Sequence, residues 1–149
     1  MTQNNSLSGE LDRLSQAARV VLKLDVGNAY TKLVVSGAGN ANAYPVLRAL
    51  SPEMVLSQRP SNPDEATAML AGLWLWHDCL DESHKVSQSL NTVSGSMWHA
   101  IMHRREGDFS NSKYWYARCE NHPVLPSLAS LANDVINPFP ADKSALRIV

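Results

Sequence analysis

The chain has few of the residues that mark several large protein classes, beginning with cysteine. Its two cysteines, Cys79 and Cys119, lie far apart and form no Cys-x-x-Cys pair. This favours two reduced, buried thiols over a disulfide framework or a zinc knot. An excess of one charge is also lacking, because 13 Lys and Arg face 14 Asp and Glu. The balanced charge disfavours nucleic acids and anionic membrane surfaces as partners.

Long hydrophobic runs and known nucleotide motifs are absent as well. The longest apolar run, residues 68–76, is far shorter than the roughly 20 residues that cross a bilayer. Residues 1–9 are polar and lack the basic and apolar segments of a secretion signal, so we expect a cytoplasmic protein. The sequence also lacks a phosphate-binding glycine loop, a nucleophile elbow and a dinucleotide fingerprint.

What the chain does contain is enough apolar material for one core. With 149 residues and 44% hydrophobic content, it is predicted to form a single domain over residues 1–149, with irregular tails at 1–8 and 137–149. A domain of this size buries roughly 68–70% of its unfolded surface. The apolar spacing is mainly helical, so the predicted fold class is all-α, built from antiparallel helix hairpins.

The first half is predicted to hold one helix and a long irregular stretch. Ser8 can cap a helix over residues 9–23. Residues 30–35 are β-branched and aromatic, and their pattern fits either a strand or an extension of a helix. Residues 44–63 carry four prolines, which indicates a loop with one helical turn near residues 52–56.

Helix signals are stronger in the second half. Asn62 can cap a helix whose first turn holds Pro63, and its apolar stripe continues in polar form to Gln88. Further helices are predicted over residues 96–106, ended by Gly107, over 111–120 and over 126–133.

Two segments repeat one spacing of histidines and carboxylates, His-x3-Asp-x2-His and His-x3-His-x2-Glu. At about 100° per residue, positions i, i+4 and i+7 share one helical stripe, so each segment would present two imidazoles and a carboxylate on one face. The six residues are His77, Asp81 and His84 in the first segment and His99, His103 and Glu106 in the second.

If the two stripes face each other, they would line a polar pocket between helices. Imidazole and carboxylate suit zinc, manganese or non-haem iron, so we predict a site for a divalent metal or a small polar ligand. A bound ion with an open position could activate water for hydrolysis, with Glu106 or Asp81 as proton acceptor. The alternative is that the same residues form a structural hydrogen-bonding network without an ion.

Arg104 and Arg105 suggest a second ligand-binding possibility. Together with His103, Lys113 and Arg118 they could line an anion site. Glu106, Asp108 and Glu120 lie among them in the sequence, so a salt-bridged surface explains the same residues.

Residues 96–123 contain a set of small and aromatic residues at defined spacing. The set is Ala100, Gly107, Asp108, Phe109, Ser112, Tyr116, Cys119 and Pro123. This segment resembles the inner part of a tetratricopeptide repeat, and the resemblance covers about one repeat. It implies a helical hairpin and, as an alternative function, a non-catalytic domain that docks a protein partner or forms a homodimer.

A longer block, residues 73–124, is similar to uncharacterised bacterial and fungal proteins. It includes Leu75-Trp76-His77-Asp78 and His103-Arg104-Arg105-Glu106. This resemblance implies no activity.

Overall fold

A computed structural model describes residues 11–119 and 121–136 of the chain. The chain divides into two compact units, residues 1–119 and 120–149, which we describe separately. Every regular element in the described residues is helical, which confirms the predicted all-α class. The predicted tails, residues 1–8 and 137–149, lie outside the described residues, and the single domain stays a prediction.

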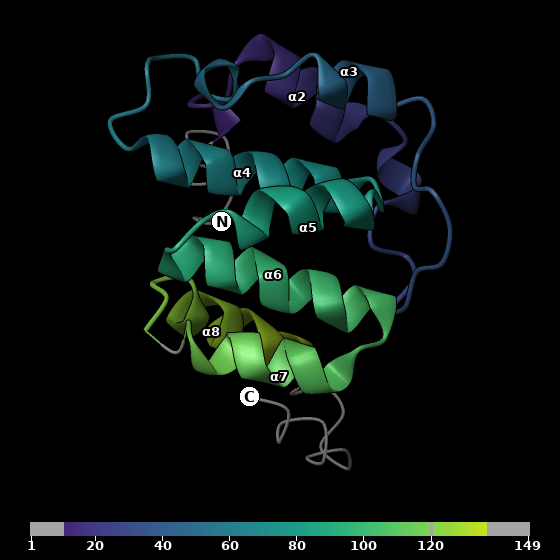
Figure 1. Cartoon of the computed structure of the whole chain (residues 1–149), viewed down its shortest axis with the longest axis vertical. Helices are drawn as coiled ribbons and strands as arrows, with labels where there is room; N and C mark the ends of the chain where they lie inside the picture. Colours follow the sequence, from purple (N-terminus) through teal and green to yellow (C-terminus); the bar gives the residue numbers. More distant parts are fainter. Residues whose placement is uncertain (1–10, 120, 137–149) are drawn as a thin grey trace. The chain divides into compact units, whose positions relative to one another are not determined.

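The first unit contains six α-helices and two short 3-10 helices in its described part (Figure 1). Their bounds are α2 Gln16–Lys23, η1 Val26–Asn28, α3 Tyr44–Arg48, η2 Pro52–Met54, α4 Pro63–Trp76, α5 Leu80–Gln88, α6 Val93–Glu106 and α7 Phe109–Ala117. The second unit contains α8, Leu125–Ile136. None of the described helices is long and apolar enough to cross a bilayer.

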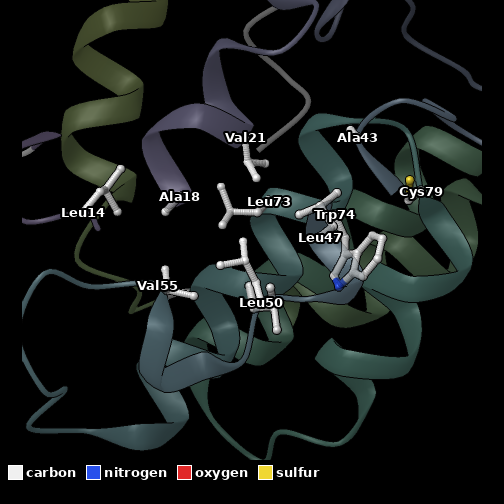
Figure 2. Close-up of a cluster of buried hydrophobic side chains, with 11 residues drawn as sticks. Leu14, Ala18, Val21, Ala43, Leu47, Leu50, Val55, Leu73, Trp74 and Cys79 are labelled. Carbon is white, nitrogen blue, oxygen red and sulfur yellow. The ribbon is translucent and has the colours of Figure 1, made fainter. Parts of the chain in front are cut away.

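Helices α4, α5, α6 and α7 pack one against the next, and α2 contacts α4 from the other side (Figure 1). The main core lies where α2, α3 and the chain after α3 meet α4, as Figure 2 shows. Leu47 and Val55 are fully buried there, and Leu73 and Trp74 of α4 pack against them. Full burial of one such aliphatic side chain stabilises the fold by roughly 1.5–3 kcal/mol. This core holds α4 in place, and α5 and α6 pack against α4.

Several helix ends follow the predicted capping chemistry. The Asn62 side chain accepts hydrogen bonds from the backbone N–H groups of Asp64 and Glu65, so α4 begins at Pro63 as predicted. Gly107 ends α6 with φ of 91°, a left-handed conformation that glycine adopts at little cost. Asp108 then caps α7 by accepting from the N–H of Asn111.

The predicted continuation of the second helix to Gln88 is wrong. Helix α4 ends at Trp76, and the N–H of Cys79 reaches back to the carbonyl of Trp74. Asp78 has φ of 61°, a left-handed value that aspartate tolerates better than most residues. The chain therefore turns here and starts a new helix, α5, at Leu80.

The first half departs further from the prediction. Helix α2 begins at Gln16, because Leu14 pairs with Leu56 and the Ser15 side chain caps the helix, so the predicted helix over residues 9–23 is not continuous. The first two residues of that prediction lie outside the described part of the chain. Residues 30–35 form neither the strand nor the helix, although Val35 donates its N–H to the carbonyl of Arg105. The predicted turn near residues 52–56 is present as η2, whereas α3 was not predicted.

Smaller differences concern the later helices. Helix α6 begins at Val93, three residues before the predicted start, because Thr92 supplies the cap. Helix α7 ends at Ala117, before the predicted residue 120. Helix α8 covers the predicted segment and extends beyond it at both ends.

Candidate metal centre

Three of the predicted histidines lie together between α5 and α6. His84 comes from α5, while His99 and His103 lie one helical turn apart on α6. The ring centroids are 4.7 Å apart for His84 and His99, 5.3 Å for His84 and His103, and 4.7 Å for His99 and His103. One ring nitrogen from each histidine lies within 4.8 Å of the other two. We call these three residues the histidine triad.

The triad is shielded from solvent on most sides. His99 and His103 are only 4% and 5% exposed, and His84 is half-buried. The indole of Trp115, from α7, stacks on the His99 ring with the centroids 4.0 Å apart and the planes 19° from parallel. Helix α7 therefore forms one wall of the site, with an aromatic surface against His99.

His103 has a carboxylate partner on its own helix. Its Nδ1 lies 2.6 Å from Oε1 of Glu106, one turn further along α6. The side-chain amide nitrogen of Asn111 lies 3.5 Å from the same Nδ1. Asp108 contributes a second carboxylate close to His103 and Glu106. A hydrogen bond to one ring nitrogen fixes the orientation of the whole imidazole.

Burial affects the protonation of two of the histidines. Burial, together with smaller contributions from the neighbouring His103 and His84, lowers the pKa of His99 to about 4. Burial and His103 also lower the pKa of His84, against the opposing effects of Glu106 and Asp81. Near neutral pH both rings are therefore uncharged, the form in which imidazole binds metals.

The depressed pKa of His99 predicts a loss of stability in acid. The unfolded chain binds a proton at this residue near pH 6.5, whereas the folded protein resists protonation until about pH 4. The free energy of unfolding should therefore fall as the pH drops from about 6.5 to about 4, by about 1–2 kcal/mol after allowance for solvent screening. Urea denaturation of the metal-free protein at several pH values in this range measures how the free energy of unfolding depends on pH.

His99→Phe is the control variant for this pH dependence of the free energy of unfolding. It keeps an aromatic ring against Trp115 but carries no titratable nitrogen. Its free energy of unfolding should change less over the same pH range. A slope equal to that of the unmodified protein would show that other groups cause the acid sensitivity.

Three predicted ligands lie outside the triad: Glu106, which contacts His103, and also His77 and Asp81. His77 follows the end of α4, is buried, and its Nε2 lies 2.8 Å from the carbonyl oxygen of Val21 in α2. The prediction that it lines the same pocket is wrong, because the helix ends before it and its ring contacts α2. Asp81 is exposed on the first turn of α5, where its charge acts on His84 from a distance.

The two arginines of the predicted anion site do not share surroundings. Arg104 is partly buried, and its guanidinium carbon lies 6.0 Å from the centre of the Phe109 ring. Arg105 is 4% exposed, donates to the carbonyl of Leu75 and lies 2.7 Å from a carboxylate oxygen of Asp78. The guanidinium of Arg105 is thus engaged inside the protein, and the structure brings no shared arginine site together.

Sequence reasoning missed the roles of two residues on the α7 side. Neither Trp115 nor Asn111 was among the predicted site residues. The one available signal was the turn at Gly107, which returns α7 along α6.

Comparisons of the chain with protein-family models, curated proteins and solved structures found no match. The tetratricopeptide-like resemblance therefore stays a prediction.

Proposed function

We propose that the protein binds one divalent transition-metal ion, with zinc as the best fit, through His84, His99 and His103. The observation that carries the proposal is the approach of three imidazole nitrogens to within 4.8 Å of one another. Zinc binds imidazole nitrogens at about 2.0–2.1 Å, which in a tetrahedral site separates the nitrogens by about 3.3 Å. To reach that spacing the His99 ring would have to turn relative to the His103 ring, because two stacked rings, here 18° from parallel, do not direct their lone pairs at one point.

The electrostatics of the triad favour a neutral ligand set. The pKa values of His84 and His99 are both lowered, so protons compete weakly for these nitrogens near neutral pH. A cation would also offset the cost of burying several polar rings between two helices.

His99 supports a ligand role more than a structural one. Its Nδ1 is buried and has no hydrogen-bond partner among the described residues. In a structural network, a buried ring nitrogen would normally be satisfied, because an unpaired one costs about 1–3 kcal/mol. This favours the metal proposal over the alternative of an interaction domain with a purely structural histidine network.

Three protein ligands would leave one coordination position of a tetrahedral ion for water or a small polar ligand. An ion of this kind lowers the pKa of bound water towards 7 and can support hydrolysis. Metal-assisted hydrolysis would follow only from metal binding at the triad. The proton-acceptor roles predicted for Glu106 and Asp81 apply only if such a reaction takes place.

The test is a metal count combined with zinc titration of the metal-free protein. Untagged protein, prepared without chelators, should contain close to one equivalent of metal by elemental analysis. Titration calorimetry of the metal-free protein should show saturable binding of one equivalent of zinc. His99→Phe and His103→Ala should each lose most of the bound metal, because each removes a nitrogen ligand. His122→Ala, which changes a histidine outside the triad, is the matched control and should retain it.

Two results would reject the proposal. One is a metal content below about a tenth of an equivalent together with no saturable zinc uptake. The other is equal zinc binding by the unmodified protein and by both triad variants. In either case the histidine network of the interaction-domain alternative would remain as the explanation of the triad.

A further inference from the structure

We infer that Glu106 is a positioning residue that acts on the metal through His103 and not as a ligand of the ion. This inference rests on the proposed function and assigns Glu106 a role different from the one its spacing predicts. The contact that carries it is the 2.6 Å distance between Oε1 of Glu106 and Nδ1 of His103.

The chemistry of the pair determines which nitrogen remains available. An ionised carboxylate only accepts hydrogen bonds, so the Nδ1 of a neutral His103 must carry the proton that it donates to Glu106. The bare lone pair is then on Nε2, at the opposite edge of the ring. Ligating histidines in metalloproteins commonly donate their second ring nitrogen to a carboxylate in this way.

Burial makes the orientation persistent. The His103 side chain is 6% exposed, whereas that of Glu106 is 39% exposed, so the ring is held inside while the carboxylate stays partly solvated. The ring also stacks on His99, with the planes 18° apart, and the Asn111 side chain approaches it from α7. Packing therefore limits rotation of the imidazole, and the hydrogen bond selects its tautomer.

Asp81 lies three residues from His84, as Glu106 lies three residues from His103, and so allows a comparison. Asp81 precedes His84 in the chain and is exposed. Its charge raises the pKa of His84, but no hydrogen bond joins the two side chains among the described residues. Removal of Asp81 thus takes away a nearby negative charge without removing an imidazole hydrogen bond.

The first measurement needs no metal. Nitrogen-15 NMR of metal-free protein in mildly alkaline buffer distinguishes protonated from bare ring nitrogens. We expect His103 to carry its proton on Nδ1 in the unmodified protein and in Glu106→Gln, whose amide oxygen can still accept. In Glu106→Ala the preference should be lost. The opposite tautomer in the unmodified protein would overturn the inference whether or not zinc binds.

The second measurement is zinc affinity. Glu106→Ala should weaken it by about 10–100-fold, the usual effect of removing such a partner. Glu106→Gln should recover most of that loss, and Asp81→Ala should change the affinity less than Glu106→Ala. If Glu106 bound the ion directly, Gln would be as damaging as Ala, and that result would overturn the inference. Failure of the unmodified protein to bind zinc would reject the proposed function and leave the tautomer result standing.

Discussion

Arg105→Met should lower the free energy of unfolding by about 3 kcal/mol, because it removes a buried cation with several partners. The guanidinium donates to the carbonyls of Leu75 and Lys32 and pairs with Asp78. It also lies 4.4 Å from the centre of the Tyr30 ring. Methionine keeps much of the aliphatic stem but removes the donor to both carbonyls and the positive charge beside the carboxylate.

The measurement is chemical denaturation, supported by hydrogen exchange over residues 30–35. That segment should exchange faster in the variant, because Arg105 holds it through side-chain contacts. Arg104→Met is the matched control on the neighbouring residue, and it should change stability by less than about 0.5 kcal/mol. Equal effects of the two substitutions would show that the buried Arg105 pair contributes no more to stability than the partly buried Arg104.

Zinc should raise the midpoint of thermal unfolding by about 5–10 °C when free zinc is present at about 100 times its dissociation constant. Binding to the folded state alone would add about 2.7 kcal/mol at that concentration. For a domain of this size, each kcal/mol moves the midpoint by about 2–4 °C. The physical reason is that the ion would join His84 of α5 to two residues of α6.

Differential scanning calorimetry with and without zinc measures this shift. His99→Phe should abolish most of it, while His122→Ala should reproduce the full increase. Magnesium, which prefers oxygen ligands, should have little effect. A zinc shift of the same size in His99→Phe would place the stabilising ion elsewhere on the protein.

The elements with strong local signals were predictable from the sequence. Asn62 followed by Pro63 marked the start of α4, and Gly107 marked the end of α6. These residues cap or end helices through backbone bonds close in sequence, so tertiary packing does not override them. The i, i+4 spacing of His99 and His103 likewise placed both on one face of α6.

The parts that depend on distant contacts were not predictable. The end of α4 rests on the left-handed Asp78, whose carboxylate pairs with Arg105 from another helix. No periodicity within residues 63–88 reveals that contact, so His77 was assigned to the wrong surroundings. Only His84 of the first stripe reaches the triad, because the new helix starts after the turn. The irregular residues 30–35 are likewise anchored by α6 and not by their own propensity.

The face-to-face contact of Trp115 with His99 gives the protein an intrinsic optical probe. An indole excited state transfers an electron readily to a positively charged ring stacked on it, and much less readily to a neutral one. Emission from Trp115 should therefore dim when its imidazole neighbour acquires a proton and change again when the ring is drawn towards a cation. Occupancy of the centre could then be followed in real time without a label, in a variant whose other three tryptophans are phenylalanine.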